Sequence, residues 1–244
     1  SIYRRSLSTA EIWKIFAAGE KGYTKCASYQ TMADMDGDML SDLAIFRPSG
    51  TNGAEWWWLK SSGGNGAVQF GSANDAVVTA DYTGDGKTDI AYWQPSTGFW
   101  YVRRSEDPTY YAFPFGGTGD VPVPADYDGD GKADAAVFRA SNTTWYVSRT
   151  TGGTGITQFG AAGDKPVVDD YDGDGKADIA VFRPNGTGGA EWWIAQSSGG
   201  VFATQFGQPT DKAVPADYTG DGRADIAFWQ PATGYWFVLR SDDY

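Results

Sequence analysis

The sequence predicts an all-β chain built from tandem repeats, and three observations support this. An acidic motif, D-x-[D/T]-G-D-x-x-x-D, occurs five times, beginning at residues 34, 81, 126, 170 and 217. Successive copies start 44 to 47 residues apart. Short apolar and aromatic segments, separated by turns rich in Gly and Ser, follow each copy and are typical of short strands. A fixed period of this length indicates one supersecondary unit repeated along the chain.

The elements of one repeat follow a constant order. After the acidic loop comes a short apolar segment, such as residues 179–184, and then a turn. An aromatic strand follows, as in Trp145–Val147, and after a Gly/Ser-rich turn comes a Phe-Gly pair such as Phe159-Gly160. Four residues later stands an aspartate, and six residues after that the next loop opens. Each repeat is therefore expected to contribute four short β segments.

The acidic loops predict calcium sites. Ca²⁺ takes about 6–8 oxygen ligands at flexible geometry, and each loop offers side-chain oxygens at its first, third, fifth and ninth positions. Without a cation, carboxylates held this close would repel one another. An EF-hand is excluded because its twelfth-position Glu is missing. Up to five structural Ca²⁺ ions are expected, held by Asp34, Asp36, Asp38, Asp42, Asp81, Thr83, Asp85, Asp89, Asp126, Asp128, Asp130, Asp134, Asp170, Asp172, Asp174, Asp178, Asp217, Thr219, Asp221 and Asp225.

The third loop position varies together with a residue eleven places further on. Where the third position is Asp, as at Asp128, that residue is Arg, as at Arg139. Where it is Thr, as at Thr83, that residue is Gln, as at Gln94. Because charge and countercharge appear together, the sequence predicts that the two side chains lie close in space.

The acidic loops, short strands and Phe-Gly turns over residues 23–244 resemble the FG-GAP or VCBS repeats that build the β-propeller head of α-integrins. The resemblance implies a β-propeller. It leaves the function open, because that family includes adhesins, lectin-like modules and passengers on enzymes.

The chain ends predict five four-stranded blades in a ring closed by N-terminal strands. The fifth copy stops after Trp236–Val238, and the residues before Asp34 supply similar material. Residues 1–22 lie outside the repeat, and a capping box over Leu7–Ile12 predicts one short N-terminal helix. This segment resembles the C-terminal end of a laminin-G-like, concanavalin-type domain. It is expected to be the tail of an upstream domain or a linker, with residues 23–244 forming the propeller.

The charge balance favours metal binding outside the cell. The net charge is −12, and the five loops contain 18 of the 31 acids. Five Ca²⁺ ions would leave about −2, and no basic patch suggests nucleic acid. Calcium sites of about 10⁻⁴–10⁻³ M are useful in extracellular modules, so a secreted or surface location is expected. No apolar run is long enough to span a membrane.

The sequence does not predict an enzyme. It contains no histidine, which removes the commonest general base and every His-based triad. Paired carboxylates could hydrolyse glycosides, but Glu55 and Glu191 are equivalent members of two repeats rather than a converging pair.

The best candidate ligand site lies on two longer Gly-rich segments, residues 49–55 and 185–191. Their ends supply Trp57, Trp58 and Trp193, flanked by Glu55 and Glu191. Flat aromatic faces beside a few polar groups suit sugars, whereas the tryptophans that recur at one repeat position favour core. The expected function is a calcium-binding adhesion or binding module for carbohydrate or a surface protein. The alternatives are a subunit of a surface assembly or filament that docks through its N-terminal segment, and an accessory domain of a polysaccharide-degrading enzyme.

Overall fold

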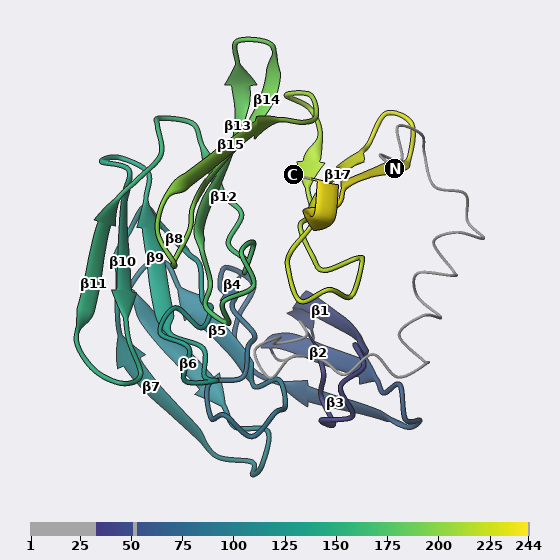
Figure 1. Cartoon of the computed structure of the whole chain (residues 1–244). Helices are drawn as coiled ribbons and strands as arrows, with labels where there is room; N and C mark the ends of the chain where they lie inside the picture. The colour runs from purple at the N-terminus through teal and green to yellow at the C-terminus, as the bar shows by residue number, and fades with distance from the viewer. Residues whose placement is uncertain (1–32, 51–52, 244) are drawn as a thin grey trace. The chain divides into compact units, whose positions relative to one another are not determined.

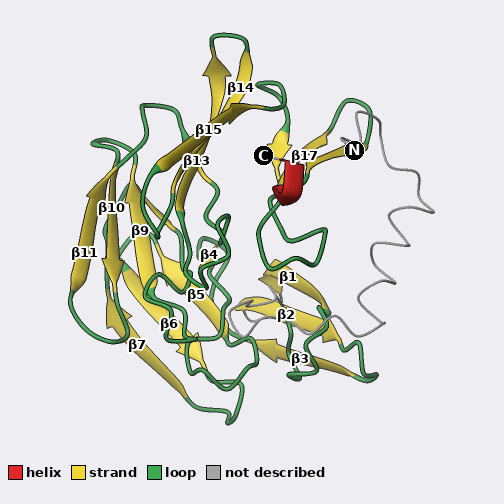
Figure 2. Cartoon of the chain, in the orientation of Figure 1, coloured by secondary structure: helices red, strands yellow, loops and turns green. Residues whose placement is uncertain are grey.

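The computed structural model describes residues 33–50 and 53–243, and these residues form five antiparallel sheets. The strands of each sheet follow one another in chain order (Figure 1). The described chain contains strands, loops and one short helical turn, Ser241–Asp243 (Figure 2). It falls into two compact units divided between Thr157 and Gln158. The expected all-β fold with five propeller-type blades is confirmed.

The five sheets are named blades 1 to 5. Blade 1 contains β1 (Leu43–Gly50), β2 (Gly53–Leu59) and β3 (Asn65–Gln69). Blade 2 contains β4 (Ala76–Val77), β5 (Ile90–Gln94), β6 (Phe99–Arg103) and β7 (Tyr110–Pro114). Blade 3 contains β8 (Asp120–Pro122), β9 (Ala135–Arg139), β10 (Thr144–Ser148) and β11 (Thr154–Gln158). Blade 4 contains β12 (Lys165–Pro166), β13 (Ile179–Gly186), β14 (Gly189–Ala195) and β15 (Val201–Gln205). Blade 5 contains β16 (Lys212–Ala213), β17 (Ile226–Gln230) and β18 (Tyr235–Leu239).

Each complete blade begins one strand earlier than the repeat predicted from its acidic loop. The short strand before the loop pairs with the first strand after it, so that β12 pairs with β13 across the fourth loop. Three of the five sheets have the expected four strands among the described residues. The N-terminal helix, the segment 1–22 and the strands expected to close the ring lie outside the described residues.

The strands of blade 4 show why these segments form a sheet. Along β14, buried and partly exposed side chains alternate, and Trp192 and Ile194 are fully buried. Trp192 lies opposite Thr204 of β15 and Phe182 of β13. Its indole N–H donates to the Phe206 carbonyl at 2.8 Å, which satisfies the polar end of a buried ring. Equivalent bonds join Trp56 to Phe70 in blade 1 and Trp100 to Phe115 in blade 2. The recurring Phe carbonyl thus anchors the recurring Trp.

The arginines that follow the acidic loops do not pair with the third loop position, and that prediction was wrong. Arg139 instead makes a two-pronged pair with Asp120, at 2.8 and 2.9 Å. Arg183 pairs with Asp164 in the same way, at 2.9 Å for both bonds. Each aspartate follows a Phe-Gly turn and its side chain is 1% exposed. The guanidinium therefore compensates a buried carboxylate at the blade edge rather than a metal loop.

Blades 2 and 5 have no arginine to compensate the equivalent buried aspartate. Gln replaces Arg, and one carboxylate oxygen of Asp75 and of Asp211 is buried without a hydrogen-bond partner. Aromatic stacks stand beside these aspartates: Tyr92 on Tyr101 in blade 2, and Phe228 on Phe237 in blade 5. In blades 3 and 4 it is the arginine that lies over the equivalent aromatic ring, 4.7 Å from Tyr146 and 5.1 Å from Trp193.

Replacing Arg183 by Gln should lower the free energy of unfolding by about 2–3 kcal/mol, because the buried Asp164 carboxylate loses two charged hydrogen bonds. The matched control is Arg47→Gln. Arg47 is 60% exposed and pairs with Glu55 at 3.2 Å, so its loss should cost less than about 1 kcal/mol. Urea unfolding of the two variants measures the difference. Equal losses of unfolding free energy in the two variants would show that the burial of Asp164 does not determine how much its pair with Arg183 stabilises the fold.

Candidate metal centres and ligand surface

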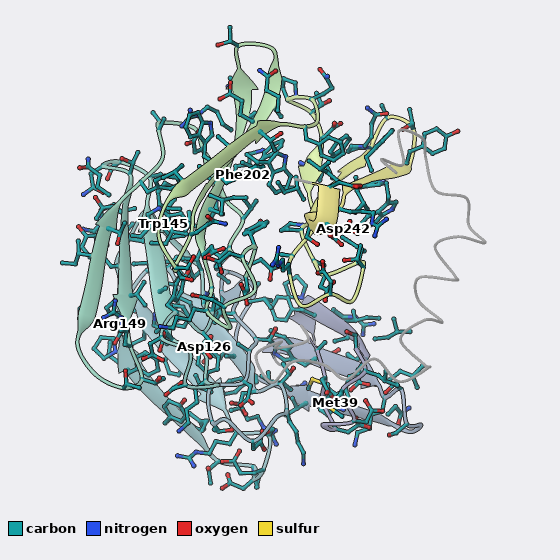
Figure 3. The ribbon with its side chains drawn as sticks, in the orientation of Figure 1. Met39, Asp126, Trp145, Arg149, Phe202 and Asp242 are labelled. Atoms are coloured by element: carbon teal, nitrogen blue, oxygen red, sulfur yellow. The ribbon has the colours of Figure 1, made fainter. Side chains whose placement is uncertain are left out.

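The five acidic loops, named loops 1 to 5 in chain order, are held by their own backbone. In loop 3, Asp126 accepts the N–H of Gly129 at 2.6 Å with one oxygen and that of Gly131 at 2.8 Å with the other. The ninth residue, Asp134, accepts the N–H of Tyr127 at 3.0 Å. These bonds curl the loop so that its first and ninth carboxylates face each other. Figure 3 labels Asp126 in this loop.

Neighbouring loops within each unit are joined to one another. The carbonyl of the first aspartate in one loop accepts a backbone N–H from the next loop, as between Asp170 and Ala224 at 2.7 Å. Gly173, at φ +78, has no room for a side chain, because an added Cβ would lie 3.0 Å from Arg223 Cγ. The glycine at the fourth loop position therefore lets the long cationic side chain of the next loop pass over it.

Three loops bring carboxylates close enough to hold a cation. One oxygen from each of the first, third and ninth residues lies within 4.8 Å of the others, in the groups Asp34/Asp36/Asp42, Asp126/Asp128/Asp134 and Asp170/Asp172/Asp178. The fifth-position aspartate turns to its own loop, where Asp130 accepts the N–H of Lys132 at 2.9 Å. The structure thus brings together three of the four predicted ligand positions in loops 1, 3 and 4.

A second element that the sequence analysis missed supports every loop. The turn after the aromatic strand lies against the loop of its own blade. Its first residue stands 16 or 19 positions after the ninth aspartate and bonds to it in every blade. In blade 3 the Thr150 N–H donates to Asp134 at 2.7 Å, and its hydroxyl donates to Asp130 at 2.8 Å. The Thr151 hydroxyl donates to Asp128 at 2.5 Å. The hydroxyl pairs Ser61-Ser62, Thr150-Thr151 and Ser197-Ser198, at equivalent places in three blades, were the available sequence signal.

Burial of the loop carboxylates disfavours their charged form. Desolvation raises the pKa of Asp178 to about 6, against the lowering effect of the N–H groups of Ser197 and Tyr171. Burial likewise raises the pKa of Asp134 and of Asp170. Asp169, next to the first ligand of loop 4, has its pKa raised to about 6, mainly by burial, with smaller effects from Asp170 and Asp217. A bound divalent cation would relieve this electrostatic cost.

The chemistry of the donors fits calcium. All are hard oxygens, and a carboxylate that accepts two N–H bonds retains further lone pairs for a metal. In loop 2 the Thr83 hydroxyl oxygen is shielded from solvent and has no hydrogen-bond partner. An orphan oxygen among oxygen ligands is consistent with a cation at that place.

Two of the predicted sugar-binding residues, Glu55 and Trp57, lie together on one face of blade 1, where they meet an arginine that was not predicted, Arg47. Trp57 is 46% exposed, and its indole N–H donates to Glu55 at 3.2 Å. Arg47 pairs with the same carboxylate oxygen and lies 5.9 Å from the Trp57 ring centroid. Strand pairing places Arg47 opposite Glu55.

Blade 4 repeats this arrangement. The Trp193 indole N–H donates to Glu191 at 2.9 Å, and Arg183 lies 5.1 Å from the ring centroid and 3.6 Å from the Glu191 carboxylate. The two surface groups, Arg47/Glu55/Trp57 and Arg183/Glu191/Trp193, are named the Arg-Glu-Trp surfaces.

Trp58 does not belong with Trp57. Successive residues of β2 point to opposite faces of the sheet, so Trp58 shares its face with the buried Trp56. It covers Gly66, where an added Cβ would lie 2.3 Å from the Trp58 ring. A recess of about 180 Å³, to which Ile45, Trp57 and Val77 contribute, lies in the same unit. It is smaller than the roughly 300–1,000 Å³ of enclosed ligand pockets, so a sugar would lie on Trp57 rather than inside a cavity.

Comparison with known proteins decides the family. The model of the FG-GAP-like repeat matches residues 34–92, 81–137, 126–181 and 170–228, and each match begins at the first aspartate of a loop. The chain belongs to the FG-GAP-like repeat family. All five loops lie within the matched range. The N-terminal likeness to a laminin-G-like domain finds no support, and no match was found among curated proteins.

Several solved structures match this chain at low sequence identity. An Agrocybe aegerita lectin that specifically recognises non-reducing terminal N-acetylglucosamine superposes with a TM-score of 0.52 and 20% identity, over 83% of this chain and 66% of that one. The chain thus spans slightly less than two thirds of the lectin. Virginiamycin B lyase from Staphylococcus aureus gives a TM-score of 0.46 at 9% identity, over 82% of this chain and 74% of its own. A streptogramin B lyase gives 0.43 at 10%, over 82% and 73%. Among the described residues no helix is long and apolar enough to cross a membrane.

Proposed function

We propose that this FG-GAP-like protein is a calcium-binding, non-catalytic module that binds carbohydrate outside the cell. The Arg-Glu-Trp surfaces of blades 1 and 4 carry the proposal for carbohydrate. The acidic loops carry the proposal for calcium.

Calcium would be structural. Each of the three acid groups directly precedes a strand. The ninth carboxylate of each group also accepts an N–H from the turn after the aromatic strand. Asp34, Asp36 and Asp42 would hold an ion in loop 1, and the equivalent residues would do so in loops 3 and 4. The ion would supply positive charge and fix the loop to the turn. Affinities in the millimolar range suit extracellular calcium, which supports a secreted or surface location.

Carbohydrate suits the Arg-Glu-Trp surfaces because three complementary groups meet there. The exposed part of the Trp57 ring offers an apolar face to sugar C–H groups, and Glu55 accepts hydroxyl hydrogens. Arg47 can donate to ring or hydroxyl oxygens. Because the same three residue types recur around Trp193, the chain offers a second contact of the same kind in blade 4.

The lectin that shares the fold suggests which glycans to test. It recognises terminal N-acetylglucosamine, so the first probes should include glycans with that end. Absence of catalysis is proposed because the sequence contains no histidine and its acids are assigned largely to the loops. A protein ligand, or self-assembly, is the competing proposal.

The test is a glycan array probed with the calcium-loaded protein. We expect binding to fall at least about tenfold in the double variant Trp57→Ala/Trp193→Ala, because both stacking faces are lost. Trp58→Ala is the matched control: it removes the neighbouring indole from the opposite face of β2 and should leave binding intact. Circular dichroism confirms that each variant is folded. A blank array from folded wild type would contradict carbohydrate binding and favour a protein partner.

A further inference from the structure

Loops 2 and 5 differ from the other three at the third position, where threonine replaces aspartate. Each therefore carries three carboxylates instead of four. The Thr83 hydroxyl is buried without a hydrogen-bond partner. The Thr219 hydroxyl makes only long contacts, at 3.4 Å to Asp217 and 3.5 Å to Asp225. Taken alone, these loops would offer a divalent cation less charge than loops 1, 3 and 4.

The turn after the aromatic strand faces the third position in the other loops. Its second residue donates a hydroxyl to the third-position carboxylate: Ser62 to Asp36, Thr151 to Asp128 and Ser198 to Asp172. In all five blades the first turn residue donates its N–H to the ninth aspartate, as Ser105 does to Asp89 at 2.8 Å and Ser241 does to Asp225 at 2.6 Å. The turn is thus held in the same place in every blade.

In blades 2 and 5 the second turn residue is itself an acid. Glu106 follows Ser105, and Asp242 follows Ser241. The hydroxyl and the carboxylate have changed sides: the loop carries the threonine and the turn carries the acid. Every loop has four carboxylates when the second turn residue is counted with it.

We propose that Glu106 and Asp242 are calcium ligands that supply the missing carboxylate to loops 2 and 5. The inference rests on the calcium binding proposed above and extends it to a bipartite site, formed by a loop and a turn about twenty residues apart. Thr83 and Thr219 then serve as neutral oxygen donors beside the acid from the turn. The chain holds five sites of similar charge instead of three strong and two weak ones.

Both acids directly follow a serine that is hydrogen-bonded to the loop, and both are weakly held by other groups. Glu106 lies 3.4 Å from the Ser105 hydroxyl, which itself donates to the loop residue Asp85 at 2.7 Å. Its other oxygen pairs with Arg104 at 3.4 Å, and both side chains are about 40% exposed. Asp242, labelled in Figure 3, pairs with Arg240 and is 51% exposed. Exposed pairs of this kind contribute little, so a divalent cation can draw either carboxylate away.

The test is calcium titration of the whole metal-free chain by isothermal calorimetry, with terbium luminescence as a second readout. We expect five sites in the wild type. In the double variant Glu106→Gln/Asp242→Asn, two of them should weaken at least about tenfold while three are unchanged. The matched control is Asp107→Asn/Asp243→Asn, which removes the adjacent acid of each turn and should leave all five sites intact.

The outcomes separate this inference from calcium binding itself. A wild type that binds no calcium overturns both. A wild type that binds five ions, with a double variant that binds them equally well, overturns the role of Glu106 and Asp242 alone. A wild type that binds only three ions, with a double variant that still binds three, also overturns the role of Glu106 and Asp242. Loops 2 and 5 would then hold no ion. Loss of all five sites in the control variant would also count against it.

Discussion

We expect removal of calcium to lower the melting temperature of this protein by more than about 10 °C. A ligand at one hundred times its Kd stabilises the folded state by about 2.7 kcal/mol per site. In a chain of this size, 1 kcal/mol shifts the melting temperature by about 2–4 °C. Two occupied sites are therefore enough. In each of loops 1, 3 and 4, three carboxylates offer oxygens that lie within 4.8 Å of one another. Without the ion, a charged Asp178 is disfavoured mainly by burial and to a smaller extent by repulsion from Asp172, which together raise its pKa to about 6.

Thermal melts followed by circular dichroism check this result in about 10 mM calcium, which is one hundred times a Kd of about 10⁻⁴ M, after chelation, and after calcium is restored. Magnesium at the same concentration is the control, because it prefers stricter octahedral geometry and retains its water. It should restore less of the loss than calcium does. An unchanged melt after chelation would rule out a structural role for calcium in these loops.

The repeats and the metal loops could be predicted because their information is local. Loop 3 supplies its ligands from nine consecutive residues, so spacing alone brings Asp126, Asp128 and Asp134 together. The recurring tryptophan was also predictable as core, since Trp100, Trp145 and Trp192 are fully buried.

The partners of these loops were not predictable in the same way. Arg139 stands at a constant offset from both Asp120 and Asp128, so the repeat pattern cannot tell which carboxylate it meets. Variation at the third position favoured Asp128, but the structure pairs the arginine with Asp120 and gives Asp128 to Thr151. The strand decides between them: β9 carries Arg139 away from the loop at about 3.3 Å per residue and places it opposite Asp120.

The candidate sugar surface shows a different limit of prediction from the sequence. Trp57 and Trp58 are adjacent, and the sequence analysis treated them as one cluster at the end of a Gly-rich segment. Once the segment is known to be a strand, the period of two puts them on opposite faces. The strand register also explains why Arg47 meets Glu55, since the two residues are cross-strand partners.

The core tryptophan of blade 4 should be among the most costly single residues to remove. We expect Trp192→Ala to lower the free energy of unfolding by at least about 4 kcal/mol. Removing a fully buried Trp costs about 3–5 kcal/mol through lost transfer and the cavity left behind. The Phe206 carbonyl, which accepts the indole N–H at 2.8 Å, then loses its partner, at a further cost of about 1–3 kcal/mol. Urea unfolding of the calcium-loaded protein, followed by circular dichroism, measures the change.

Trp236 provides the matched control because it occupies the same repeat position in blade 5. It is partly exposed, whereas Trp192 is fully buried in a cluster that includes Phe182 and Ile194. Trp236→Ala should therefore cost less than half as much as Trp192→Ala, since the area removed from water and the residual cavity are both smaller. Equal losses at the two positions would mean that repeat position, and not burial in the individual blade, sets the contribution of this residue.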